Sequence, residues 1–97
     1  MYNLNEVKKA AQVIRAINNP MRHQIVELLK SKELNVTEIH TRLGIPQEVA
    51  SQQLHILRQF KVLNHRRDGK YILYSVNTEI LNSLIGIVQI LNKSYEK

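Results

Sequence analysis

Hydrogen-bonding side chains recur along residues 47–59 at spacings of three and four, which places them on one face of a helix. Glutamine can make a bidentate contact with adenine in the major groove, and serine can bond a phosphate or a base edge. Ordinary surface helices mix Glu with Lys, whereas this face is rich in glutamine and holds one acid. We therefore expect it to contact DNA, through Gln47, Glu48, Ser51, Gln52, His55 and Arg58.

A second group of residues with DNA-binding chemistry surrounds Asp68-Gly69. An Asp-Gly pair between two β-prone runs predicts a hairpin, here with strands over 62–67 and 70–76. A two-stranded ribbon with arginines at its tip can follow the DNA backbone or enter the minor groove. Alternatively, the charges only protect an exposed sheet edge from pairing. Because the hairpin follows the polar helix, we expect DNA contacts from its cations, which are Arg66, Arg67 and Lys70.

The distribution of charge agrees with a polyanionic partner. The 97 residues carry a net charge of +6, with a pI near 9.8. Residues 42–70 hold six Lys or Arg against two acids, whereas residues 71–92 hold a single charged residue, Glu79. One region is therefore suited to meet an anion, and the other is suited to burial.

Hydrophobic periodicity predicts the scaffold that positions these side chains. The predicted helices cover about 7–17, 20–29, 38–43, 46–60 and 79–92. The fold class is then mainly α (α+β), a winged helix-turn-helix of about five helices with the β-hairpin wing between the fourth and fifth. Residues 1–97 form a single domain, because a chain of this length supports only one core.

Residues that favour helix ends lie at the predicted boundaries. Asn19 and Thr37 are the expected N-caps of the second and third helices, and Asn77 or Thr78 caps the fifth. Gly44 can adopt the left-handed conformation that ends a helix and so makes the turn before the fourth. The fourth helix opens at proline and turns these apolar residues inward: Val49, Ala50, Leu54, Leu57 and Phe60.

The last predicted helix is apolar around most of its circumference. A terminal helix of so small a domain is hard to surround, and an exposed apolar band indicates a subunit contact. The alternative is a helix at the centre of the core. We expect a homodimer built from the first and last helices, through Val7, Ala11, Ile14, Leu81, Leu84, Ile85, Val88 and Leu91.

Three stretches of the chain resemble the ArsR/SmtB-type repressors: Asn19-Pro20-Met21-Arg22, Leu43-Gly44-Ile45 followed by Ser51-Gln52-Gln53-Leu54, and Arg66-Arg67-Asp68-Gly69-Lys70-Tyr71. The resemblance covers nearly the whole chain. It implies a homodimer that binds an imperfect palindrome in double-stranded DNA and is often released by an inducer. We include Arg22, from the first stretch, among the expected DNA contacts.

The chain departs from this family at both of its usual metal sites. Asn35 and Thr37 stand where many relatives carry a Cys-x-Cys pair, and the chain has no cysteine. The predicted last helix contains no His or Asp, the residues that form the family's second site. Pro46 also replaces the usual hydroxyl cap of the fourth helix. The four histidines fall on different elements, so we expect no metal site and no cofactor: His23, His40, His55 and His65.

Several classes of function are disfavoured. The chain has few carboxylates, no glycine-rich phosphate loop and no nucleophile-base spacing, so we expect no enzyme. It lacks a signal-peptide pattern at its start, and its apolar stretch 80–91 is short and interrupted, so we expect a cytoplasmic protein without membrane contact. The sequence predicts a transcriptional repressor. Two alternatives stay open: a winged-helix module that binds a protein, and a sensor with an unfamiliar metal or small-molecule site, including an unknown inducer.

Overall fold

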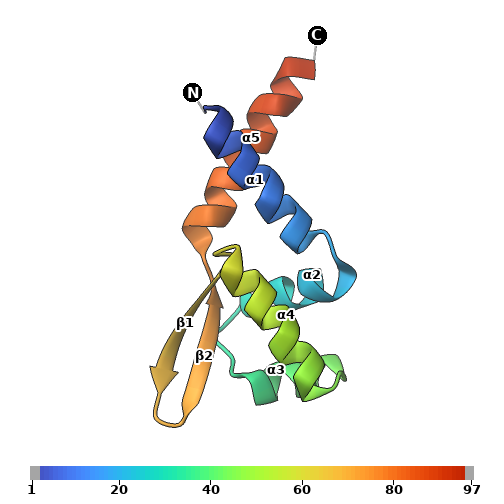
Figure 1. Ribbon diagram of the computed structural model, residues 1–97, viewed down its shortest axis with the longest axis vertical. Helices are drawn as coiled ribbons and strands as arrows, with labels where there is room; N and C mark the ends of the chain where they lie inside the picture. The colour runs from blue at the N-terminus through green and yellow to red at the C-terminus, as the bar shows by residue number, and fades with distance from the viewer. Residues whose placement is uncertain (1–2, 96–97) are drawn as a thin grey trace.

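The computed structural model describes residues 3–95, with side chains described as far as residue 86. Its elements are α1 (Leu4–Ile17), α2 (Pro20–Leu29), α3 (Val36–Leu43), α4 (Gln47–Gln59), β1 (Leu63–Asp68), β2 (Tyr71–Val76) and α5 (Thr78–Tyr95). In Figure 1, α1 and α5 lie at one end of the molecule, and α3, α4 and the hairpin lie at the other. The predicted winged helix-turn-helix, with its wing between α4 and α5, is confirmed.

Two of the predicted N-caps are confirmed. The Asn19 side chain accepts hydrogen bonds from the backbone amides two and three residues ahead, at 3.1 and 3.2 Å. The Asn77 side chain accepts one from the amide of Ile80 at 3.3 Å. At the start of the chain Asn3 caps α1 in the same way, so α1 begins at Leu4, earlier than the apolar pattern predicts. Each cap satisfies an amide that has no acceptor inside its own helix.

The prediction that Thr37 caps α3 is wrong. Asn35 is the cap: its side chain accepts a bond from the Glu38 amide at 2.9 Å, and the Glu38 carboxylate accepts one from the Asn35 amide at 3.1 Å. This reciprocal arrangement needs an acid or amide three residues after the cap. Glu38 stands at that distance from Asn35, so α3 starts at Val36.

One hydrophobic core joins α2, α3, α4 and the base of the wing, and Val13 and Ala16 of α1 are part of it. Burial of each large apolar side chain stabilises the fold by about 1.5–3 kcal/mol. In α4, Ala50, Leu54 and Leu57 are completely buried and face this core. The expectation that Phe60 also faces inward is wrong, because α4 ends at Gln59 and Phe60 is its C-cap, 36% exposed. The largest fully buried side chains of the core are Ile25, Leu34, Ile39, Leu54, Leu57 and Val62.

Both edges of β2 are bonded, which fixes the wing to the rest of the molecule. Along one edge β2 pairs antiparallel with β1, beginning with Leu63 opposite Val76. On the other edge Tyr74 exchanges two backbone hydrogen bonds with Leu34, of 3.2 and 2.9 Å. Since Leu34 is itself buried in the core, the base of the wing is held by packing as well as by hydrogen bonds.

The turn of the wing lies one residue later than the sequence indicates. Asp68 pairs with Tyr71, so the loop is Gly69-Lys70, and Asp68 is the last residue of β1. Gly69 has a φ of +63°, whereas Lys70 does not have a positive φ. A positive φ at the first loop position alone is the pattern of a type II′ turn, which takes glycine there.

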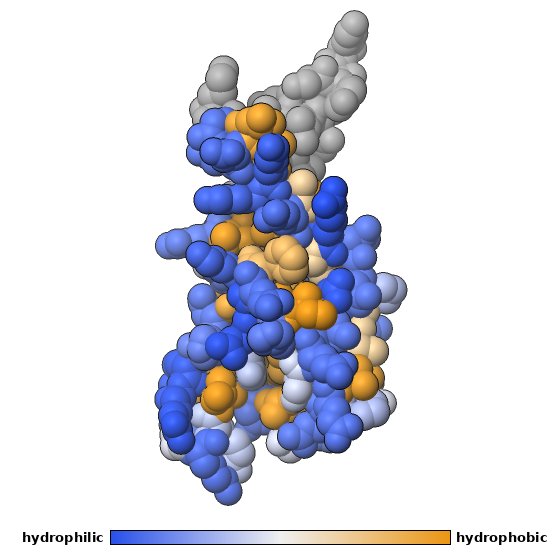
Figure 2. Space-filling model, viewed as in Figure 1, coloured by the Kyte–Doolittle hydropathy of each residue, from blue (hydrophilic) through white to orange (hydrophobic). Residues whose placement is uncertain are grey.

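The end of the molecule formed by α1 and α5 is less completely packed. α1 buries Ala10, Val13 and Ala16, but several of its larger apolar side chains are exposed. Figure 2 shows hydrophobic patches among the hydrophilic side chains at this end, and a hydrophilic outer edge on the wing. Over the described residues no helix is long and apolar enough to cross a membrane. The exposed large apolar residues at this end are Leu4, Val7, Ile14 and Ile85; elsewhere they are Phe60, Tyr71 and Ile72.

Candidate nucleic-acid interface

The turn between α3 and α4 is closed by Gly44. Its φ is +66°, and the following amide, that of Ile45, donates to the carbonyl of His40 at 3.1 Å. A Cβ at Gly44 would meet nothing within 4 Å, so the preference for glycine is conformational and not a matter of space. Pro46 then occupies the N-cap position of α4 and provides no side-chain hydrogen bond, in agreement with the absence of a hydroxyl cap.

The outer face of α4 is polar from its first turn to its last. Five of the six predicted contacts on this helix are exposed, and Arg58 is half-buried at its end. The inner face is the completely buried row that ends in Leu57. The first turn of the outer face is hollowed, and the lining of this hollow is Gln47, Glu48, Ser51 and Gln52. The structure thus brings the predicted base-contacting residues together on one accessible surface.

A contact between side chains couples the end of α4 to the wing. Nη2 of Arg58 lies 3.1 Å from Nε2 of His65, on β1. Because a guanidinium can only donate, this bond requires the His65 Nε2 to be an unprotonated acceptor. The polar outer face of α4 is therefore joined to β1 through His65, which is not among the predicted DNA contacts.

Arg66 makes a bidentate ion pair with Glu33, with both nitrogen-oxygen distances at 2.9 Å. Glu33 precedes Leu34, which is bonded to the outer edge of β2, so the pair reaches across β2 from β1. The Arg66 guanidinium holds the pKa of Glu33 below its ordinary value, and Glu33 raises the pKa of Arg66. Because the pKa of Glu33 is lowered, the ion pair stabilises the folded state at pH values above the ordinary carboxyl pKa. This stabilisation is lost as the pH falls through the lowered pKa.

The other two cations of the wing lie at its tip. Nε of Arg67 donates to the carbonyl of Gly69 at 3.1 Å, which holds the side chain along the turn. Nζ of Lys70 lies 5.3 Å from the centre of the Tyr71 ring, within the range of a cation–π contact. Both cations are exposed, and neither makes an ion pair with a residue that the structure describes.

Arg22, on α2, makes internal contacts. Its Nε donates to the carbonyl of Ala16 in α1, and its Nη1 donates to Oε1 of Gln53 in α4 at 3.1 Å. The side chain is partly buried. The geometry therefore gives Arg22 contacts that tie α1 and α2 to the inner side of α4. The sequence could not have revealed this role, because Gln53 is 31 residues away along the chain.

The predicted dimer residues lie together on α1 and α5. Val7 and Ile14 are exposed on α1, and Ile85 is exposed on α5, at 36%, 43% and 54%. The three others whose side chains are described are partly buried: Ala11, Leu81 and Leu84. The side chains of Val88 and Leu91 lie outside the described residues. A surface of exposed apolar residues thus exists where the sequence predicts one.

Comparison with known proteins identifies the family. A family model described as a domain of unknown function (DUF4423) matches residues 3–95. The transcriptional repressor PagR of Bacillus anthracis is 42% identical over 83 residues, which span 84% of this chain and 80% of PagR. The transcriptional repressor SdpR of Bacillus subtilis is 34% identical over 82 residues, which span 84% of this chain and 91% of SdpR.

A solved structure agrees with these relatives. It is the homodimeric winged helix-turn-helix DNA-binding domain of Mb0332 from Mycobacterium bovis, described as a possible ArsR-family transcriptional regulator. Its TM-score is 0.73 at 26% sequence identity, and the match covers 94% of this chain and 84% of that one. This chain belongs to the ArsR family of winged helix-turn-helix transcriptional regulators. It is not an enzyme.

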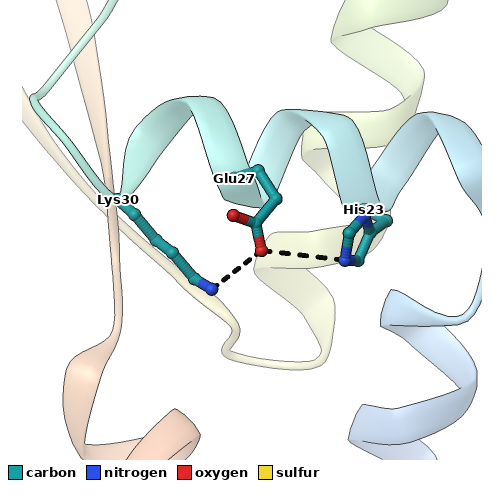
Figure 3. Close-up of polar contacts among 3 residues, drawn as sticks. All are labelled: His23, Glu27 and Lys30. Atoms are coloured by element: carbon teal, nitrogen blue, oxygen red, sulfur yellow. Dashed lines mark hydrogen bonds and ion pairs between the residues drawn. The ribbon is translucent and has the colours of Figure 1, made fainter.

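In this ArsR-family chain the stretch that matches the usual thiolate site has a structural role. Asn35 caps α3, and Thr37 is an exposed residue in its first turn. On α2, His23, Glu27 and Lys30 form an exposed polar row, in which Glu27 contacts Lys30 at 2.8 Å and His23 at 3.7 Å (Figure 3). Lys30, by hydrogen bond and charge, lowers the pKa of Glu27. Among the residues described, no group of three or more His, Cys, Asp or Glu could hold a metal ion.

Proposed function

We propose that this ArsR-family chain is a sequence-specific repressor that binds an imperfect palindrome in double-stranded DNA as a homodimer. The observation that carries the proposal is the two-sided α4, with a completely buried inner row and an exposed, glutamine-rich outer face beside a cationic wing. Helices of this kind dock in the major groove with their outer face on the bases. PagR and SdpR are both named as transcriptional repressors, which supports repression as the outcome of binding.

The contacts divide into base recognition and positioning. Gln47, Ser51 and Gln52 lie on the exposed first turns of α4 and have the donors and acceptors for base edges. Arg67 and Lys70, at the exposed tip, are assigned to the phosphate backbone or the minor groove. Phosphate contacts of this kind contribute affinity and salt dependence, while base contacts contribute sequence preference.

Two other predicted contacts take supporting roles in this proposal. Arg66 is already paired with Glu33, so its main contribution is to hold the wing in a fixed direction beside α4. Arg22 is tied to Ala16 and Gln53 and keeps α4 in place. Both side chains then act on DNA binding by fixing the surfaces that touch the DNA.

The homodimer is formed by α1 and α5 in this proposal. The radius of gyration is 14.9 Å, above the value of about 12.5 Å expected for a compact domain of this length. An extended protomer with exposed apolar residues at one end is suited to a partner that covers that end. A two-fold pair would set two copies of α4 about one turn of DNA apart, ~34 Å, as required for successive major grooves. The Mycobacterium bovis domain, which is described as homodimeric, supports a dimeric state.

Selection of bound duplexes from a random pool tests the proposal. The expected result is an enriched motif with two inverted half-sites whose centres are about 10 base pairs apart. Binding should weaken steeply as salt is raised, because lysines and arginines displace counterions from the DNA. Failure to enrich any sequence, together with an absence of salt-dependent binding to genomic DNA, would support a winged-helix module that binds a protein instead.

A further inference from the structure

A basic hollow lies where the end of α4 meets the start of β1, beyond the glutamine-rich turns. Its volume is about 610 Å³ and it is open to solvent, so a phosphate group can reach the residues that line it. No acidic side chain lines it. The lining residues are His55, Arg58, Gln59, Lys61, Leu63, Asn64, His65 and Asn77.

The backbone of Lys61 provides a second, independent observation. Its φ is +61°, and it is the one non-glycine residue with a positive φ in the part of the chain that the structure describes. The left-handed conformation is unfavourable for residues with a Cβ, and lysine is not among the types that tolerate it best. Strained backbone of this kind collects at functional sites.

The C-terminal ends of α3 and α4 have the same backbone pattern but different residues at the left-handed position. After α3 the left-handed position is Gly44, with the next amide bonded to the carbonyl of His40. After α4 the same pattern recurs: the amide of Val62 donates to the carbonyl of Leu57 at 3.0 Å, and the left-handed residue between is Lys61. The motif itself would be satisfied by glycine at both places. A lysine side chain at the second place therefore calls for a role outside the helix end.

Neighbouring contacts hold Lys61 in this conformation. Nδ2 of Asn77 donates to the Lys61 carbonyl at 2.9 Å, and the Asn77 amide donates to the Val62 carbonyl at 2.8 Å. The Lys61 side chain is exposed at the hollow, next to Arg58. Two cations are thus presented at the end of the α4 surface that we assign to DNA.

We propose that this hollow binds a phosphate group of the DNA backbone, with Lys61 and Arg58 as its cationic ligands and Asn64 as a neutral donor. The inference rests on the proposed function. The first turns of α4 would lie against base edges, while its last turn and β1 hold the phosphate that fixes the depth and angle of the helix. Lys61 is then a DNA contact that side-chain periodicity along α4 does not indicate, because it lies beyond the helix.

A pair of substitutions separates the charge of Lys61 from its backbone. Lys61→Gly removes both the charge and the strain, and Lys61→Gln removes the charge alone. We expect both variants to lower the salt slope of DNA binding by about one ion per protomer, which is roughly an eightfold loss of affinity per hollow at 0.1 M salt. Only Lys61→Gly should raise the melting temperature, by about 2–5 °C. Lys61→Arg should keep the wild-type slope.

The control is Lys32→Gln, which removes the same charge from the α2–α3 connection, outside the hollow. It should keep a salt slope close to that of the unmodified protein. If the unmodified protein binds DNA and both Lys61 variants keep its slope, the hollow is not a phosphate site, although the proposed function stands. If the unmodified protein does not bind DNA at any salt concentration, the proposed function itself fails.

Free anions provide the last arm of the test. Inorganic phosphate is titrated into the unmodified protein at constant ionic strength, and the amide signals of Asn64 and His65 are followed by NMR. A backbone-phosphate site should respond only at millimolar concentrations, because the free ion lacks the rest of the DNA contact. Saturation at micromolar phosphate would assign the hollow to a soluble anion and overturn the proposal.

Discussion

The two ends of this molecule differ in how completely they bury their apolar residues. At the end that holds α3, α4 and the base of the wing, the core includes six large side chains with essentially no exposure. At the other end, α1 and α5 leave Val7, Ile14 and Ile85 more than a third exposed. The first end also exposes Phe60, Tyr71 and Ile72, but these lie at the end of α4 and on the wing, outside its closed core. The exposed apolar residues of the second end lie on the two terminal helices, where a second copy could cover them. Substitutions at the first end should destabilise the protomer, whereas substitutions at the second end should prevent dimerisation.

The largest expected effect comes from a charge on the α5 surface. Ile85→Glu should leave the protomer folded, because the side chain is 54% exposed, yet prevent two copies from packing together. We expect an affinity loss of about 100-fold or more for the palindromic site, since the gain from binding both half-sites at once is lost. Circular dichroism checks the fold, and a shift assay measures binding. A variant that stays dimeric and binds normally would place the subunit contact elsewhere.

At the opposite end, Leu54→Ala should destabilise the fold itself. Leu54 is completely buried in the core, and truncation of such a side chain costs about 2–5 kcal/mol. Chemical denaturation measures the loss. Its comparison is Ile85→Ala, which should cost much less in the protomer. If the two variants lost equal free energies of unfolding, the two ends of the protomer would not differ in how they are packed.

Within the DNA-binding end, Gln52→Ala should affect sequence preference. Gln52 is exposed on α4, and loss of a bidentate contact with a base costs about 1–3 kcal/mol at the preferred base pair. When the affinity is measured for operators that differ by single base pairs, the variant should bind all four base pairs equally at one position. A uniform loss over all sequences would instead assign Gln52 to the backbone.

The three wing cations should not be equivalent. Arg67→Ala should flatten the salt dependence of binding by about one ion per protomer, because this exposed side chain is assigned to DNA. Arg66→Ala should change the slope less, since Glu33 already neutralises Arg66. Glu33→Gln frees the Arg66 charge and should leave the slope unchanged or steeper. Equal flattening by Arg66→Ala and Arg67→Ala would show that Arg66 leaves Glu33 to contact DNA.

The smallest expected effect is that of zinc. The chain has no cysteine, and Asn35 and Thr37 stand where family members carry thiolates. Low micromolar Zn²⁺ should therefore leave the affinity for DNA unchanged, as measured by the same shift assay. Stoichiometric zinc that dissociates the complex would reveal a site built from other ligands.

The features that sequence predicted correctly depend on neighbours in the chain. Asn19 and Asn77 cap helices through amides two or three residues away, and Gly44 closes a helix through its own backbone. The choice of Thr37 failed within the same short range, because Asn35 has the matching acid and Thr37 does not. The turn of the wing was predicted at Asp68-Gly69, one residue too early, because Asp68 pairs with Tyr71 and belongs to β1. Local chemistry thus gives elements reliably and their ends less so.

The features that sequence did not reveal depend on tertiary contacts. Arg66 and Glu33 are 33 residues apart and meet only because β2 lies between their segments. Arg22 was expected to contact DNA, and only the fold places Gln53 beside it. The positive φ of Lys61 has no signal in its residue type, which favours other conformations. Such roles follow from the packing of whole elements against one another.

The sedimentation velocity of the unmodified protein at tens of micromolar tests the central claim most directly. If α1 and α5 form a surface that a second copy completes, the protein should sediment as a species of twice the 11.3 kDa mass of the chain. The dimer should persist at high salt, because apolar contacts hold it together. A monomer of 11.3 kDa that still binds one half-site tightly would contradict the account of a dimeric repressor.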